Sequence, residues 1–289
     1  MPEIITLFQQ NSTLFVTCFS LFGLIIGSFL NVVIYRLPKM MEQDWRQQCQ
    51  ELCNPDTKSN TVSVKYNLIT PRSACPNCNK LISGIENIPV LSYLFLKGKC
   101  KECKSLISPR YPAVELISAL LLGLIASKFG FSTTTLAASL FALSLLTLAC
   151  IDLDTHLLPD DITLPLLWIG LIFNLDHGFT DLQTAVIGAA VGYLILWIVF
   201  WTFKLLTGKE GMGYGDFKML AAIGAWFGWT MIPAVILLAS LIGSIVGISM
   251  IVFAKQGKNI PIPFGPYLAI GGIASLFWGK QLSQLYFGG

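Results

Sequence analysis

Four cysteines stand in two short pairs whose spacing suits a metal ion. The pairs are Cys75-Pro-Asn-Cys78 and Cys100-Lys-Glu-Cys103, and 21 residues separate them. Each pair can present two thiolates to one tetrahedral zinc ion, and the lysines around the second pair favour the thiolate form. Because four protein ligands leave no open coordination position, we expect the four thiolates to hold a structural zinc.

Other uses of the cysteines are weaker. A pair of disulfides would need an oxidising compartment, whereas the cytoplasm keeps thiols reduced. A redox Cys-x-x-Cys motif needs one such pair and not two. Cys18 and Cys150 lie in apolar segments and suit small buried hydrophobes, and Cys49 and Cys53 have no assigned role.

Two groups of acidic residues border long apolar segments, one in the run 152–161 and the other in the run 211–218. Charged side chains beside or within membrane spans are costly and usually mark a functional site. When two carboxylates meet, they share a proton, so that one activates a water while the other donates a hydrogen bond to a carbonyl oxygen. We therefore predict an acid–base pair formed by Asp152 and Asp216.

Two glycines, Gly213 and Gly215, stand directly before the second aspartate. Without a Cβ they permit the close approach of a substrate strand or an unusual backbone angle at a helix start. Simpler interpretations stay open, because Asp160 and Asp161 have the positions of helix N-caps and Asp216 has the position of a cap on the next helix.

The elements that carry these residues are apolar blocks. Of 289 residues, 54% are hydrophobic and 12% are charged, against about 25% charged in a soluble domain. A bilayer core needs roughly 20 apolar residues per helix, so we predict an all-α polytopic membrane protein with about eight transmembrane helices, two of them short. The predicted spans are approximately Thr13–Tyr35, Pro112–Lys128, Thr134–Cys150, Ile162–Leu175, Leu182–Leu205, Phe217–Trp229, Met231–Ala254 and Pro263–Lys280.

Charge sets the expected domains and orientation. Residues 1–36 hold a first helix without signal-peptide features, 37–111 a small extramembrane domain, and 112–289 a membrane core. Twelve of the nineteen Lys and Arg residues lie between Arg36 and Arg110. The positive-inside rule explains that enrichment better than nucleic-acid binding does, so we expect this domain in the cytoplasm and both termini outside. No internal repeat is evident.

Together these motifs resemble those of the prepilin peptidases, a family of membrane GxGD aspartyl proteases. The resemblance spans nearly the whole chain and rests on Gly213-Tyr-Gly215-Asp216, Asp152-x₆-Pro159-Asp160, Gly27-Ser-Phe-Leu-Asn-Val-Val-Ile-Tyr-Arg36-Leu-Pro38, Pro71-Arg-Ser-Ala-Cys75-Pro-Asn-Cys78, Pro89-Val-Leu-Ser-Tyr, Gly98-Lys-Cys100 and Pro109-Arg-Tyr-Pro-Ala-Val-Glu115.

The resemblance implies an enzyme of the bacterial inner membrane. Such enzymes remove a basic leader from type IV prepilins and type II secretion pseudopilins on the cytoplasmic side. The family's first aspartate corresponds to Asp152, with Asp154 as the neighbouring alternative, and its second corresponds to Asp216. In this mechanism zinc takes no part in cleavage.

The resemblance also implies a second activity, the N-methylation of the new N-terminus with S-adenosylmethionine. That activity is associated with the cytoplasmic tetracysteine domain, and Gly98 matches a position linked to it. No Rossmann-type glycine fingerprint marks a methyl-donor pocket. An insert around Met41–Asn60 departs from the family pattern and leaves the boundary of the methylating domain open.

Two competing readings remain. A membrane scaffold or transporter with a zinc module for binding a partner explains the spans and the cysteines, but not acids clustered at two inner faces beside a Gly-x-Gly turn. A peptidase without methyltransferase activity, as in the archaeal preflagellin peptidases, would not need the large tetracysteine domain. We expect zinc and S-adenosylmethionine as cofactors, lipid and prepilins as partners, and no nucleic acid.

Overall fold

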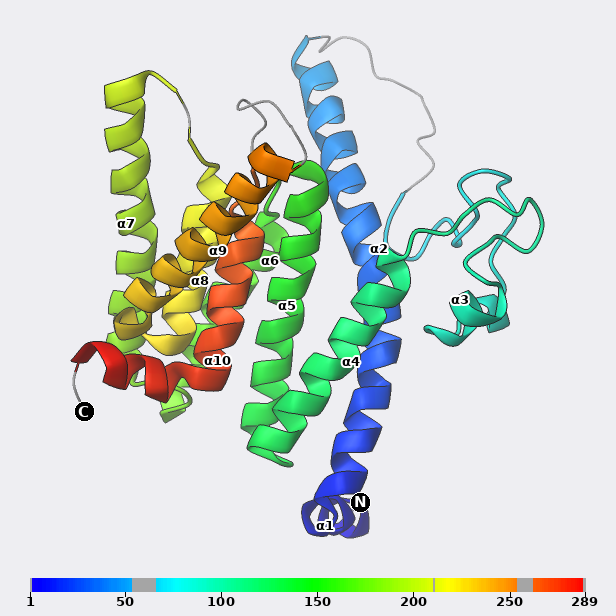
Figure 1. The fold of residues 1–289 in the computed structure, drawn as a ribbon, viewed down its shortest axis with the longest axis horizontal. Coiled ribbons are helices and arrows are strands. Elements are labelled where there is room, and N and C mark those ends of the chain that lie inside the picture. Colours follow the sequence, from blue (N-terminus) through cyan, green and yellow to red (C-terminus); the bar gives the residue numbers. More distant parts are fainter. Residues whose placement is uncertain (1, 54–65, 210, 254–261, 288–289) are drawn as a thin grey trace. The chain divides into compact units, whose positions relative to one another are not determined.

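The computed structural model describes residues 2–53, 66–209, 211–253 and 262–287. Within these ranges the chain is nearly all helical, and its strand pairing consists of two isolated bridges (Figure 1). The contacts divide the chain into two compact units, Met1–Ser139 and Leu140–Gly289. The predicted all-α fold with a small tetracysteine domain is confirmed.

Two long antiparallel helices form the centre of the first unit. The elements of this unit are α1 (Pro2–Gln10), α2 (Ser12–Cys53), the 3₁₀ turn η1 (Ile85–Asn87), α3 (Leu91–Phe95) and α4 (Arg110–Phe129). A Cβ on Gly23 of α2 would lie 2.7 Å from the Ala119 Cα of α4, and one on Gly27 would lie 2.7 Å from the Glu115 Cα. This Gly-x-x-x-Gly pair therefore lets the two backbones touch, which is how membrane helices commonly gain their packing energy.

The helix α2 is longer than the predicted first span. It continues through Pro38 to Cys53. Past this proline the chain is rich in Met, Glu, Gln and Arg, which are good helix formers, and side chains four apart pair along it, as in Arg46–Glu42 at 2.5 Å. The expected insert at 41–60 thus extends the helix as far as residue 53, and residues 54–60 lie outside the described part of the chain.

The second unit surrounds one buried helix. Its elements are the remainder of α5 (Thr133–Thr155), which begins in the first unit, then α6 (Asp160–Phe173), η2 (Asn174–Asp176), α7 (Leu182–Thr207), α8 (Tyr214–Phe227), η3 (Trp229–Met231), α9 (Ile232–Phe253) and α10 (Gly265–Phe287). The helix α8 packs against α6, α7 and α10, and every residue from 217 to 227 except Lys218 is buried. A Cβ on Gly192 of α7 would lie 2.7 Å from the Leu220 carbonyl oxygen, so α7 and α8 also pack backbone to backbone.

The C-terminal end of α8 is held by one buried amide. The Asn174 Nδ2 donates to the carbonyl oxygens of Ala225 at 2.9 Å and Trp226 at 3.0 Å. Its Oδ1 accepts from the N–H groups of Phe179 at 2.8 Å and Thr180 at 3.2 Å. The last carbonyls of a helix have no partner within the helix, so this side chain satisfies two of them and fixes α8 along its axis.

All eight predicted spans are present as helices, but they differ in length. Among the described residues, five elements are long and apolar enough to cross a bilayer, namely α2, α4, α5, α7 and the η3–α9 segment Trp229–Val252. The helices α6 and α8 have 14 residues each, which is about 21 Å at about 1.5 Å per residue, against a bilayer core of about 30 Å. The chain is therefore a multi-pass membrane protein, and the number of eight crossings stays a prediction.

Candidate active site and metal centre

Asp216 lies in the first turn of α8, in the core of the second unit. The helix has Gly213 as its N-cap, and Asp216 is 5% exposed. Its Oδ2 accepts the Gly213 N–H at 3.3 Å. Its Oδ1 is buried and has no hydrogen-bond partner among the described residues. Buried polar atoms without a partner are rare in proteins, so the Asp216 carboxylate is a candidate functional group and not only a structural one.

Asp152 comes from the C-terminal end of α5 and is 4% exposed. Its Oδ2 accepts the N–H of Gly265, the first residue of α10, at 2.9 Å. A Cβ on Gly265 would lie 2.7 Å from that same oxygen, so any side chain at position 265 would displace the Asp152 carboxylate. The start of α10 therefore positions Asp152.

The two aspartates lie in one site. A Cβ on Gly215 would lie 2.6 Å from the Leu158 Cβ, and one on Gly265 would lie 3.3 Å from the Leu158 Cδ2. The Leu158 side chain thus packs between the two glycines, each of which adjoins one aspartate. Each aspartate thus adjoins a glycine that packs against the same leucine side chain. Three helix ends, from α5, α8 and α10, build the site.

The other acids of the first cluster have different surroundings. Asp154 is exposed, in contrast to Asp152 two residues before it. The N-cap interpretation of Asp160 is wrong, because α6 has Pro159 as its N-cap and no side-chain cap. Instead both Asp160 carboxylate oxygens lie 2.7 Å from the Lys218 Nζ, which ties the first turn of α6 to that of α8. Burial thus separates Asp152 from its acidic neighbours.

The four cysteines of the first unit form a second site. Their Sγ atoms lie within 4.8 Å of one another. Cys75 and Cys103 are 3.8 Å apart at sulfur, and Cys78 and Cys100 are 4.0 Å apart. A tetrahedral ion with four Zn–S bonds of about 2.3 Å requires sulfur atoms about 3.8 Å apart. The donor set and its spacing therefore fit a zinc ion.

The two cysteine pairs have the same backbone structure. Cys75 donates its N–H to the Lys80 carbonyl oxygen at 2.9 Å, and Cys100 donates to that of Ser105 at 2.8 Å. The sequence Cys-x-x-Cys-x-x-Leu-Ile-Ser occurs at 75–83 and again at 100–108. The expectation of no internal repeat is therefore wrong for this short segment, in which each copy supplies two of the four thiols.

Hydrogen bonds, more than nearby lysines, favour the thiolate form of two cysteines. The Ser105 hydroxyl, with its Oγ 3.1 Å from the Cys103 Sγ, lowers the pKa of Cys103 to about 6. The backbone N–H of Cys78 lowers the pKa of Cys75. The N–H of Lys80 acts in the same direction on Cys78, but burial and the neighbouring thiols raise the pKa of Cys78 to about 11. Four sulfurs this close need a cation before all of them can be charged.

Gly98 has a local structural reason to be glycine. Its φ is +67°, which L side chains rarely adopt, and a Cβ would lie 2.9 Å from the Tyr93 Oη. Its N–H donates to the Tyr93 carbonyl oxygen at 2.9 Å, and its carbonyl oxygen accepts from Ile107 at 2.8 Å. Gly98 therefore positions Tyr93 on α3, and both of its backbone groups are used within the domain.

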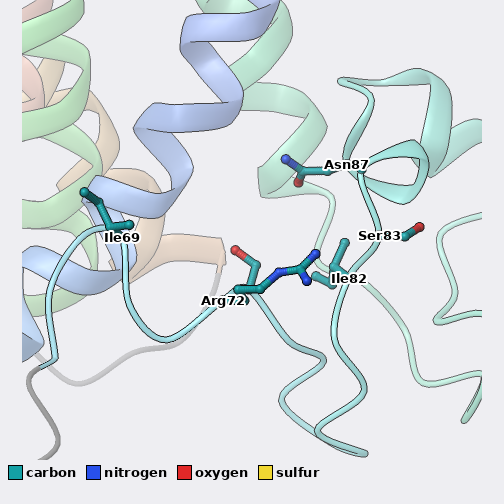
Figure 2. A pocket seen from close by; sticks show the side chains of 7 residues that line it. Ile69, Arg72, Ile82, Ser83 and Asn87 are labelled. Carbon is teal, nitrogen blue, oxygen red and sulfur yellow. The ribbon is translucent and has the colours of Figure 1, made fainter.

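A small hollow lies beside the first cysteine pair. Figure 2 shows Arg72, Ile82 and Asn87 around it, and its volume is about 260 Å³. Sites that enclose a whole drug-sized ligand measure about 300–1,000 Å³. The hollow is therefore too small to enclose a molecule of the size of S-adenosylmethionine.

Several residues that shape these sites were not expected from the sequence. Leu158 is an unspecified position of the Asp152-x₆-Pro159 motif and Gly265 belongs to no motif, and only the packing shows them beside the aspartates. Arg36 was noticed only within a motif; it is buried and donates from Nη1 to the Asn67 carbonyl oxygen at 2.9 Å and from Nη2 to that of Pro71 at 2.5 Å. The Gly-x-x-x-Gly spacing of α2 and α7 was a readable signal of close helix packing.

Two family models together match most of the chain. The model of the bacterial peptidase A24 N-terminal domain matches residues 21–129, and that of the type IV leader peptidase family matches residues 139–248. No solved structure matches significantly.

Relatives named prepilin leader peptidase/N-methyltransferase cover almost the whole chain. One from Aeromonas salmonicida is 54% identical over 92% of this chain and 91% of its own length. One from Pseudomonas aeruginosa is 53% identical over 94% and 93%, and one from Burkholderia pseudomallei is 47% identical over 91% and 85%. The buried aspartate pair, the tetracysteine cluster and these matches together show that the chain belongs to the type IV leader peptidase family.

Proposed function

We propose that this protein is a bifunctional enzyme of the bacterial inner membrane. It cleaves the basic leader from type IV prepilins or type II secretion pseudopilins, and it then N-methylates the N-terminus that cleavage exposes. The names of its relatives support both activities. The observation that carries the peptidase assignment is the pair of buried aspartates, Asp152 and Asp216, on either side of Leu158, with the Asp216 Oδ1 unpartnered among the described residues.

The aspartate pair suits water-activated peptide cleavage. We assign Asp152 as the base that takes a proton from water, and we assign Asp216 as the acid because its Oδ1, unpartnered among the described residues, is free to carry and donate a proton. The resulting hydroxide adds to the carbonyl carbon while Asp216 donates its proton to the carbonyl oxygen. The intermediate collapses when the C–N bond breaks: one hydroxyl group re-forms the carbonyl and returns its proton to Asp216, and the proton held by Asp152 passes to the leaving amine, which is the new N-terminus.

The glycines before Asp216 give the substrate access to the pair. Gly213 is exposed and extended, with φ −85° and ψ 154°, and its own N–H binds the Asp216 carboxylate. A substrate strand that runs past Gly213 meets no side chain at this position, and Gly215 makes room for Leu158 beside the aspartates. We assign both glycines to the substrate site.

The tetracysteine domain supports the second activity. We propose that Cys75, Cys78, Cys100 and Cys103 hold a structural zinc, which keeps the two cysteine loops together. S-adenosylmethionine supplies an electrophilic methyl group when bound. Gly98 supports this activity as a positioning residue, because it fixes Tyr93 and α3 within the domain.

The proposed domains follow the two sites. Residues 1–36 provide the first transmembrane helix, 37–111 the cytoplasmic tetracysteine domain with the methyltransferase region, and 112–289 the membrane peptidase core. Both sites face the cytoplasm in this proposal. The excess of Lys and Arg between residues 36 and 110 supports that orientation.

The test is leader removal from a prepilin by the full chain in liposomes. Asp152→Asn and Asp216→Asn should each lower the cleavage rate by about 10²–10⁴-fold or more, because each removes a proton-transfer group. Asp154→Asn is the matched control and should cleave at nearly the normal rate, because Asp154 is exposed. Normal cleavage by folded Asp152→Asn and Asp216→Asn proteins would refute the aspartyl mechanism and favour the scaffold or transporter reading.

A further inference from the structure

The tetracysteine domain exposes an apolar face on α3. Leu91, Leu94 and Phe95 are three and four residues apart, so they share one side of the helix. They are 52%, 64% and 84% exposed, and Ile85 and Ile88 just before the helix are 80% and 42% exposed. A group of large apolar side chains open to solvent usually marks a surface that another partner covers.

A part-buried hydrogen bond fixes where this face lies along α4. The N–H of Val90, the N-cap of α3, donates to the Glu115 Oε2 at 2.7 Å. Glu115 lies five residues into α4, or about 7.5 Å along a helix that is long and apolar enough to span the bilayer. Glu115 is 8% exposed and packs against Gly27 of α2, so its side chain has a fixed place on α4.

The helix α3 therefore lies beside the first turns of a transmembrane helix. Figure 1 shows it next to the N-terminal half of α4. With α4 taken as a span, Val90 at the start of α3 lies within two turns of the end of that span. At that depth an exposed apolar face is adjacent to lipid.

Basic residues complete the pattern. Lys97 and Lys99 follow α3 directly, Lys104 lies in the next loop, and all three are exposed. Membrane-surface elements combine apolar side chains with lysines that meet anionic headgroups. The charge beside α3 therefore favours the lipid of an anionic leaflet as the partner of this face.

We propose that α3 is an interfacial membrane anchor. Leu91, Leu94 and Phe95 insert among the lipids of the leaflet at the α4 N-terminus, while Lys97 and Lys99 bind its phosphate groups. This contact holds the tetracysteine domain against the membrane surface. It rests on α4 as a span and not on the proposed function.

The test measures lipid contact directly in the full chain. An environment-sensitive fluorescent amino acid is placed at Phe95 in one protein and at Leu52 in another, and both are reconstituted in vesicles that contain phosphatidylglycerol. The two side chains are matched in exposure at 84% and 83%. Leu52 lies 21 residues beyond Asn31 on α2, or about 30 Å along the helix, whereas Asn31 is bound to Tyr111 at the start of α4.

Lipids brominated on their chains should quench the probe at 95 and leave the probe at 52 almost unchanged. Aqueous iodide should show the reverse order. Equal quenching of both probes by iodide would mean that the face lies in water, and a probe at 95 protected from both quenchers would mean that protein covers it. Either result would overturn the proposal.

A second comparison tests the lysines. Lys97→Gln combined with Lys99→Gln should weaken brominated-lipid quenching at position 95 in vesicles with phosphatidylglycerol, and should have little effect in phosphatidylcholine alone. An equal effect in both kinds of vesicle would reject the headgroup contact.

Discussion

At the scale of single residues, burial distinguishes between side chains of the same type. Asp152 and Asp154 are neighbours in sequence, but the first is 4% exposed beneath Gly265 and the second faces solvent. Asp216 could have been an ordinary helix cap, and it does accept the Gly213 N–H. A helix cap does not require a second, buried oxygen without a hydrogen-bond partner, yet the Asp216 Oδ1 is such an atom among the described residues.

The contact between Gly265 and Asp152 gives a residue-scale prediction. Gly265→Ala should lower leader cleavage at least tenfold, because its Cβ would lie 2.7 Å from the carboxylate oxygen and must displace it. Gly279→Ala on the same helix is the control, since its Cβ would lie 3.7 Å from the nearest atom, a sulfur of Met231. Rates are compared in liposomes at equal protein. Equal rates for the two variants would show that the position of Asp152 does not matter for cleavage.

At the scale of elements, glycine pairs let backbones touch and thereby place the site helices. Gly23 and Gly27 join α2 to α4, and Gly188 and Gly192 join α7 to α8. Lipid tails are as apolar as side chains, so close packing, more than hydrophobic burial, holds membrane helices together. The position of Asp216 thus depends on backbone contacts one and two turns further along α8, at Leu220 and Gly224.

Gly188→Val should separate α7 from α8, because its Cβ would overlap the Gly224 carbonyl oxygen. We expect a lower unfolding temperature in detergent and a loss of cleavage, since overpacking typically costs about 1–3 kcal/mol or more. Ala190→Val is the control, because Ala190 is exposed on the same helix. Thermal unfolding and cleavage are measured on the same preparations. A Gly188→Val protein as stable as the control would contradict the backbone contact.

The metal centre is the other element-scale unit. Cys78→Ser should abolish zinc binding and methylation while most leader cleavage remains, because the cysteine cluster belongs to the first unit and both aspartates belong to the second. Zinc content, cleavage and N-terminal methylation are measured on one sample. Cys49→Ser is the control, since that exposed thiol lies on α2 outside the cluster. Cleavage lost in proportion to zinc, in protein that keeps its fold, would contradict a purely structural metal.

At the scale of the whole molecule, charge predicts orientation. The long α2 carries Cys49 and Cys53 beyond its apolar part, and both thiols are exposed. If the positive-inside rule holds, a membrane-impermeant maleimide should label them only after the inner membrane is opened. The labelling that is lost in the double variant Cys49→Ser/Cys53→Ser is the part that belongs to these two thiols. Labelling of these two thiols in intact spheroplasts would contradict the proposed topology and place the domain outside.

The sequence by itself determined the class of the molecule and the chemistry of its sites. Apolar blocks predicted the helices, because a bilayer requires long apolar stretches whatever their neighbours are. The Cys-x-x-Cys pairs predicted the thiol cluster, because ligand spacing is local. The motifs around Asp152 and Asp216 identified the family, which the comparisons confirm.

Only the tertiary structure decided what meets across the chain. Gly265 lies 113 residues from Asp152, and Leu158 packs between two glycines that are 50 residues apart, so no local pattern could reveal these contacts. The bond from Val90 to Glu115 is likewise an outcome of packing. The physical reason is that residue types and their spacing determine the chemistry of a site and the local helices. The burial of a side chain depends instead on which distant parts of the chain pack together.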